Sequence, residues 1–438
     1  MTNAEKIGIH IPEILLPGKE VDLHKWAVIA CDQFTSQPEY WDRVSATVGN
    51  APSTYHMILP EAWLTKPDKT ERIKFSQEKM HEYLEADLLE AHKGFVLVER
   101  SVGDSVQTGL VVALDLETYN FNKGSQSLVR ATEGTILDRL PPRMQVRRGA
   151  PLELPHILVL YDDPDFSVLK PLLEQKETLP LAYDFDLMEG SGHITGHFIK
   201  DPGTLDEVIN NLADLLTPNK YQERYGDIDM THPLLFAVGD GNHSLATAKS
   251  IWEEVKPNVG IDHPARYALV ELVNLHDPSL KFEPIHRVMF NVGEGFGYLV
   301  TKHFDPNYKI QTVDNFDAMK ELVLNVEKGN QRIGMLTDTG YRVIELTAPK
   351  QNLAAGSIQE FLDAFLLRKK DAEIDYVHGD DVLIKLSQEP GNFGFYLPPL
   401  KKDNFFKSVI LDGSLPRKTF SMGHARDKRF YLEARRIN

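Results

Sequence analysis

The chain has 438 residues, of which 42% are hydrophobic and 26% are charged, a composition typical of globular proteins and unlike that of disordered or fibrous ones. Its formal net charge of −16 works against binding to polyphosphate backbones, so we expect no nucleic-acid partner. Apolar runs are only of strand length, well short of the roughly 20 residues that cross a bilayer, so we expect no membrane span.

Short apolar runs alternate with helical patterns along the whole chain, which predicts a mixed α/β fold (α+β) with a core sheet and flanking helices. The first part predicts a strand at 26–31, a helix at 71–90, and a strand pair at 94–102 and 107–116. The middle predicts strands at 156–161, 234–238, 266–275 and 285–291, a hairpin at 179–187 and 192–199, and helices at 205–216 and 245–255. The last third predicts helices at 316–327 and 358–369 and strands at 332–336, 342–346 and 393–397. Because the length exceeds that of one usual core, we divide the chain into three units, 1–125, 126–300 and 301–438.

Cysteine usage indicates the compartment. Cys31 is the single cysteine of the sequence, so no internal disulfide can form. The first 22 residues carry acids and polar groups where a secretory signal would be apolar. We therefore expect a soluble, cytoplasmic protein.

The segment with the clearest chemical meaning follows the predicted strand at 234–238. Gly239 and Gly241 flank Asp240 directly before a helix, so the backbone can turn tightly while free N–H groups at the helix start point at one spot. The positive end of the helix dipole favours anions at that spot. Asn242 and His243 can hydrogen-bond a ligand, and Asp240 can take a hydroxyl proton or hold magnesium. The alternative is that Asp240 or Asn242 simply caps the helix.

One proline-containing segment, which we interpret as a loop, carries four arginines within ten consecutive residues. Arginine suits phosphate because its planar guanidinium can form two hydrogen bonds at once. We therefore expect at least one phosphate contact from Arg139, Arg143, Arg147 and Arg148, against the alternative of a solvated, ion-paired surface segment.

Further candidates are scattered along the chain. Asp32 ends the first predicted strand, where open α/β sheets place ligand-binding groups, although it could also cap the next turn. Glu271, Asn274 and His276 are expected to share one face of a strand, and His286 and Arg287 follow in the next strand. Lys418 near the end of the chain could contact a phosphate as a point charge.

The turn Asp240-Gly241-Asn242-His243-Ser244 resembles the Asp-Gly-His-His-Arg-like turn of domain-of-unknown-function family 1015. The resemblance extends over most of the chain, through segments 26–33, 35–37, 271–278, 283–287, 375–379 and 416–420. The turn is also similar to that of the ParB and sulfiredoxin superfamily, which includes kinases that act on free serine. Asn242 replaces the first histidine of that pattern and Ser244 replaces the arginine, so a guanidinium must come from elsewhere.

The resemblance implies a ParB/sulfiredoxin-like ligand-binding core within residues 126–300, with the C-terminal α/β unit completing the site. It favours a small-molecule phosphotransferase that acts on free L-serine or a similar alcohol, with ATP, ADP or pyrophosphate as donor and Mg²⁺ as cofactor. Gly239, Gly241 and the following amides would hold phosphate, and Asn242, Arg143, His286 and Asp32 would bind the ligand. His243, Arg139, Arg287 and Lys418 would neutralise charge. Asp240 or Glu271 is the candidate base, and Asp240 a magnesium ligand.

A second hypothesis is a non-catalytic, ParB-like sensor that binds a nucleotide or phosphometabolite in the same pocket. In either case the partner is a small molecule, and a homodimer is left open as the assembly.

Overall fold

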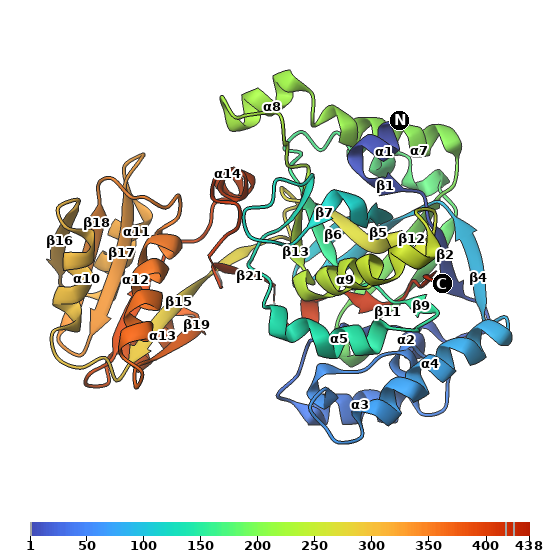
Figure 1. Cartoon of the computed structure of the whole chain (residues 1–438), viewed down its shortest axis with the longest axis horizontal. Coiled ribbons are helices and arrows are strands. Elements are labelled where there is room, and N and C mark those ends of the chain that lie inside the picture. Colours follow the sequence, from blue (N-terminus) through green and yellow to red (C-terminus); the bar gives the residue numbers. More distant parts are fainter. Residues whose placement is uncertain (1, 417, 424) are drawn as a thin grey trace. The chain divides into compact units, whose positions relative to one another are not determined.

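The computed structural model describes residues 2–416, 418–423 and 425–438, so Arg417 of the segment 416–420 lies outside the described residues. The chain forms two compact units, one made of Met1–Lys281 with Gly423–Asn438 and one made of Phe282–Met422 (Figure 1). The sequence suggested three consecutive units with boundaries near residues 125 and 300. The difference arises because β6 (Ser105–Asp115) pairs along its length with β14 (Tyr267–Asn274), which joins the first two predicted units in one sheet.

The first unit is built on a ten-stranded mixed sheet with the order β11-β12-β5-β6-β14-β10-β13-β8-β7, to which β1 adds beside β6. Its strands are β1 (Ile9–His10), β5 (Phe95–Val102), β6, β7 (Tyr119–Asn120), β8 (Val129–Ala131), β10 (Leu158–Tyr161), β11 (Leu181–Asp186), β12 (His193–Ile199), β13 (Phe236–Asp240) and β14. Short pairs join β2 (Glu13–Pro17) to β4 (Leu89–Lys93), β3 (Val28–Ile29) to β22 (Phe430–Tyr431), and β9 (Leu152–Glu153) to β23 (Arg435–Arg436). The last two pairs bring the end of the chain back to the first unit.

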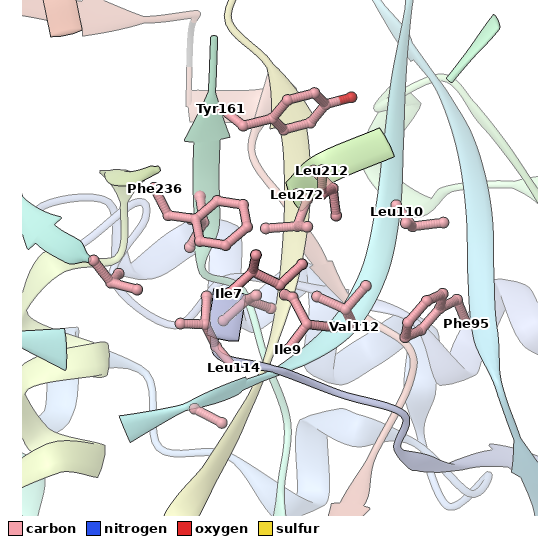
Figure 2. Packing of buried hydrophobic residues seen from close by; sticks show 14 of the residues in the cluster. Ile7, Ile9, Phe95, Leu110, Val112, Leu114, Tyr161, Leu212, Phe236 and Leu272 are labelled. Atoms are coloured by element: carbon pink, nitrogen blue, oxygen red, sulfur yellow. The ribbon is translucent and has the colours of Figure 1, made fainter. Parts of the chain in front are cut away.

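Helices cover both faces of this sheet. They are α1 (Asn3–Ile7), α2 (Leu23–Trp26), α3 (Pro38–Val48), α4 (Lys69–Glu85), α5 (Leu140–Arg147), α6 (Lys170–Glu174), α7 (Pro202–Asp214), α8 (Pro218–Tyr225) and α9 (Asn242–Val259). Successive strand side chains point to opposite faces, so Leu110, Val112 and Leu114 of β6 pack in one core while Val111 packs in the other. Figure 2 shows the first core, where the β6 side chains meet Phe95, Phe236 and Leu272. Burial on both faces explains the continuous apolar runs of the sequence.

The second unit contains an antiparallel sheet with the order β16-β18-β17-β20-β15-β19, and β21 pairs with the start of β15. Its strands are β15 (Phe282–Phe290), β16 (Tyr308–Val313), β17 (Gln331–Thr337), β18 (Gly340–Leu346), β19 (Glu373–His378), β20 (Phe393–Tyr396) and β21 (Phe420–Met422). Its helices are α10 (Phe296–Phe304), α11 (Phe316–Leu324), α12 (Ala354–Arg368), α13 (Asp380–Ser387) and α14 (Lys402–Asp412). Two apolar clusters fill it, one with α10 and α12 and the other with α11 and α13.

The predicted mixed α/β class is therefore confirmed. Among the described helices, none combines the length and the apolar character that crossing a bilayer requires.

Candidate functional site

The turn between β13 and α9 has the geometry that its glycines predict. Gly241 is the N-cap of α9 with φ 80°, a left-handed conformation that glycine adopts without strain. A Cβ atom at this position would also lie only 3.1 Å from Cα of Ile157. Among the described residues, no side chain forms a capping hydrogen bond at the start of α9, so the alternative in which Asp240 or Asn242 only caps the helix is wrong. The amides of the first helical turn therefore remain available to an anion.

Asp240 is held at the end of β13 by two donors. Its Oδ1 accepts a hydrogen bond from the Gly241 amide at 2.9 Å, and its Oδ2 lies 2.8 Å from Nζ of Lys428. Burial opposes ionisation, but the Lys428 ammonium outweighs this effect and holds the pKa of the Asp240 carboxyl below its usual value. Asp240 is therefore an ionised, cation-paired carboxylate.

His243 lies among positive groups in the first turn of α9. Burial, followed by the nearby guanidinium groups of Arg143 and Arg139, lowers the pKa of His243 to about 4. The Ile136 amide donates to its Nε2 at 3.4 Å, which requires an unprotonated nitrogen there. His243 is consequently neutral near physiological pH and would meet a ligand as a hydrogen-bonding group rather than as a cation.

The arginine-rich segment is a helix, not the predicted loop. Pro141 and Pro142 fall in the first turn of α5, where proline needs no N–H partner and its fixed φ suits the helix. Helix α5 packs beside α9 (Figure 1), which brings its basic side chains toward His243.

The four arginines have different surroundings. Arg143 forms an ion pair with Glu61, and the two side chains are only 17% and 18% exposed. Arg147 pairs with Glu153 at 2.7 Å and Arg148 with Glu254 at 2.8 Å, whereas Arg139 is exposed. Arg139 and Arg143 are therefore the two that lie near the turn.

A hydrogen-bonded relay that the sequence analysis missed begins at Ser244. Its Oγ lies 3.0 Å from Nε2 of His156, and Nδ1 of the same ring lies 2.8 Å from the Tyr431 hydroxyl. The Tyr431 hydroxyl in turn donates to Sγ of Cys31 at 3.0 Å. His156 therefore links the start of α9 to Tyr431 and Cys31 through its two ring nitrogens.

Cys31 ends this relay, and its neighbour Asp32 lies near the His156 nitrogen that faces Ser244. Asp32 Oδ2 is 3.9 Å from Nε2 of His156, and its Oδ1 accepts from the Gln33 side chain at 2.9 Å. Burial, helped by the nearby Asp32 charge, raises the pKa of the Cys31 thiol to about 12, so the thiol stays protonated. Asp32 therefore lies near the ring of His156, and its role in ligand binding stays a prediction, while Cys31 serves as a hydrogen-bond acceptor.

Asn242 and Gly239 complete the turn. The Asn242 amide Nδ2 lies 3.5 Å from Oγ1 of Thr132, while its buried Oδ1 has no hydrogen-bond partner among the described residues. A buried acceptor without a hydrogen-bond partner normally lowers the stability of the folded state, so this oxygen is suited to accept a hydrogen bond from a ligand or a water molecule. Gly239 lies in β13 and is partly exposed, one residue before Asp240.

Glu271 lies in a buried charge network. Its Oε2 is 2.9 Å from Nη1 of Arg429, close enough for an ion pair although the atoms lack hydrogen-bond geometry. Arg429 also contacts Glu433, which accepts from the Tyr183 hydroxyl at 2.6 Å. Strand β10 lies between β13 and β14, and its Leu158 is in register with Asp240 on one side and with Glu271 on the other. The two carboxylates therefore belong to the same level of the sheet.

The expectation that Glu271, Asn274 and His276 share a strand face is wrong. Residues three apart in a strand point to opposite faces. Asn274 instead exchanges hydrogen bonds with the backbone of Asp163, and His276 Nε2 lies 2.6 Å from Asp162.

Three predicted residues belong to the second unit. His286 and Arg287 are buried in β15, where Leu397 donates to Nδ1 of His286 at 3.2 Å and Arg287 lies over the ring of Tyr376. Lys418 is exposed and has φ 55°. Their participation in the site around Asp240 stays a prediction.

For magnesium, the turn offers the carboxylate of Asp240 rather than a complete set of protein ligands. Within the described part of the chain, no three His, Cys, Asp or Glu side chains gather as metal ligands. Both Asp240 oxygens already accept from nitrogen donors. Because magnesium often binds through one or two carboxylates, water and the phosphates of a substrate, Asp240 remains compatible with such an ion.

The fold and the site define a mixed α/β protein with an uncapped, glycine-led helix start, surrounded by imidazole and cationic groups. The chain belongs to the family described as "Protein of unknown function (DUF1015)", whose model matches residues 15–365. The family predicted from the turn and its companion segments is thereby confirmed. No curated protein matches the chain.

Solved structures similar to the chain include free serine kinase in complex with AMP, at 9% identity and a TM-score of 0.38, covering 74% of this chain and 90% of that chain. Another is SbnI with a C-terminal truncation from Staphylococcus aureus, at 10% identity and a TM-score of 0.36, with coverages of 73% and 85%. A third is a conserved hypothetical protein from Pyrococcus furiosus, at 10% identity and a TM-score of 0.35, with coverages of 74% and 90%. At these identities and scores the likeness assigns no activity to this chain.

Proposed function

We propose that the first unit is a small-molecule phosphotransferase that transfers a phosphoryl group to the hydroxyl of free L-serine or a similar metabolite. ATP, ADP or pyrophosphate would be the donor. The observation that carries the proposal is the uncapped start of α9, around which His243, Arg139 and Lys428 supply hydrogen bonds and positive charge. Phosphoryl transfer asks a protein mainly for such positioning and charge stabilisation.

In this proposal, the amides that follow Gly241 hold phosphate oxygens, and His243 donates or accepts a further hydrogen bond. The acceptor hydroxyl oxygen attacks phosphorus while the bond from phosphorus to the leaving oxygen breaks. The hydroxyl proton passes to a base, for which the sequence predicts Asp240 or Glu271. His156 is an additional candidate, because its Nε2 lies 3.0 Å from Oγ of Ser244 in the first turn of α9. Asp240 would hold magnesium, which would supply positive charge to the phosphates of the donor.

The same proposal includes further residues. Charge would be neutralised by His286, Arg287 and Lys418, and the ligand would be bound by Arg143, Asn242 and Asp32. The second unit would contribute to the site. The ParB/sulfiredoxin-like core, a cytoplasmic location and assembly as a homodimer belong to the same proposal.

The second candidate is a non-catalytic sensor that binds a nucleotide or phosphometabolite at the same turn. It is favoured by the pairing of Asp240 with Lys428, since a carboxylate with a lowered pKa is a poor base. Catalysis distinguishes the two candidates.

The test is to incubate the full chain with L-serine, Mg²⁺ and, separately, ATP, ADP and pyrophosphate, and to follow phosphoserine by phosphorus NMR. We expect phosphoserine with one donor, and its loss in D240N. The control is D104N, which changes an exposed aspartate in the β5–β6 turn. An unaltered turnover of D240N would remove Asp240 from the mechanism, and binding of a donor without any transfer would support the sensor.

A further inference from the structure

A cavity of about 150 Å³ lies beside the turn in the first unit. Its lining is mainly apolar and includes Met57, Leu59, Met80, Val146, Leu154 and Ile157. Arg143, His156 and Ser244 are polar groups of the lining that also lie near the turn. The four charged side chains of the lining form two ion pairs, Arg143 with Glu61 and Arg147 with Glu153.

The shape of this wall restricts what can occupy the cavity. An apolar cavity of about 150 Å³ is large enough for a benzene ring. Much of the wall offers water no hydrogen-bond partner, because it is formed by apolar side chains. Small-molecule sites in proteins are typically apolar hollows with a few convergent polar groups, as is the case here.

Two residues connect the cavity with the start of α9. Ser244 belongs to both the cavity wall and the first turn of α9, and Thr247 lines the cavity one turn further along the same helix. A molecule with its phosphate on the amides after Gly241 can therefore extend its remaining part along this side of α9.

We propose that the cavity receives the apolar body of the ligand, so the site binds phosphate monoesters of compact apolar alcohols more tightly than inorganic phosphate. This inference rests on the proposed phosphate site at the turn. It defines the ligand class by its chemistry, a phosphate joined to an aromatic ring or a branched aliphatic chain of similar size.

The test compares binding of inorganic phosphate, O-phospho-L-serine, isobutyl phosphate and phenyl phosphate to the full chain by titration calorimetry. We expect the two apolar esters to bind at least about tenfold more tightly than inorganic phosphate, since each buries apolar surface in the cavity. Equal affinities for all four compounds would overturn the inference.

Two matched substitutions locate the effect. V146F fills the cavity from α5, whereas V106F places the same side chain at a strand position that is 55% exposed. V146F should lose the preference for apolar esters but keep its affinity for inorganic phosphate, and V106F should retain both. If V146F does not fold, L154F fills the same cavity from another segment. Retention of the preference by a folded, cavity-filled variant would also overturn the inference.

The outcomes separate this inference from the proposed function. Binding of inorganic phosphate that is weakened by H243Q, without any preference for apolar esters, leaves the phosphate site standing and removes only the cavity. Failure of inorganic phosphate and all three esters to bind removes both.

Discussion

Lys428 and Asp240 meet at a distance of 2.8 Å although 188 residues separate them along the chain. The contact depends on the return of residues 423–438 to the first unit. Arg100, buried in β5, fixes this segment by donating to the carbonyl groups of Asp427 and Lys428. The cation beside the turn is thus supplied by the far end of the chain and held by a buried guanidinium.

The first prediction concerns this ion pair. The side chains of Lys428 and Asp240 are 16% and 24% exposed, so their pairing lies between the surface and buried extremes. We expect K428M to lower the free energy of unfolding by about 2 kcal/mol, because it leaves Asp240 without its cation. Urea unfolding of K428M, D240N and the double variant measures the coupling. Additive effects of the two substitutions would show that the pair contributes nothing of its own.

The second prediction concerns His243 and anion binding. An anion on the helix start should raise the pKa of His243 from about 4, because it stabilises the imidazolium form. Binding should therefore take up a proton and become tighter as the pH falls from neutrality toward about 4. Sulfate is the suitable probe, since its charge stays constant in this range. Calorimetry in buffers of different ionisation enthalpy measures the proton uptake, which H243Q should abolish. Uptake that persists in H243Q would assign the proton to another group.

The third prediction concerns His286 in the second unit, which is 1% exposed. Burial lowers its pKa to about 4, from 6.5 for an exposed histidine. Between these values the unfolded chain binds a proton that the folded chain does not, so the folded state loses stability as the pH falls from 6.5 to 4. The loss has an upper limit of about 3 kcal/mol.

Chemical unfolding across this pH range tests the effect. H286Q should flatten the dependence, because glutamine can still accept from the Leu397 amide but does not titrate. The control is H81Q, at an exposed position of α4. A slope that is the same in H286Q and the unsubstituted chain would contradict the assignment.

Local pattern was sufficient to predict the strand, turn and helix that carry the site. A strand at 234–238 and a helix at 245–255 were expected, and β13 spans Phe236–Asp240 while α9 spans Asn242–Val259. The strand pair predicted at 94–102 and 107–116 is also present, as the antiparallel pair of β5 and β6. These features depend on residues adjacent in sequence, such as the glycine that α9 needs at its start.

The contacts of the site between residues far apart in the chain could not be predicted from the sequence. His156 reads as the first residue of a buried strand, and nothing near it in the sequence indicates that Tyr431 and Ser244 will contact its ring. Lys428 reads as a solvated basic residue near the chain end until the pairing of β22 with β3 is known. The one local signal was the polarity of His156 at the head of an apolar run, since a buried imidazole requires partners.

The last prediction separates the two candidate bases of the sequence analysis. Glu271 and Arg429 are each only 2% exposed, so E271Q leaves a buried cation with Glu433 as its remaining partner. Removing one member of a buried pair typically costs about 3–5 kcal/mol, and we expect E271Q to lose stability on that scale. Turnover per folded molecule should change little, because the Glu271 carboxylate faces Arg429 rather than the turn. Thermal unfolding gives the first quantity, and phosphorus NMR at a temperature where E271Q is folded gives the second. If E271Q keeps its stability and loses turnover, Glu271 would be restored as a catalytic base and the network around Arg429 would need another role.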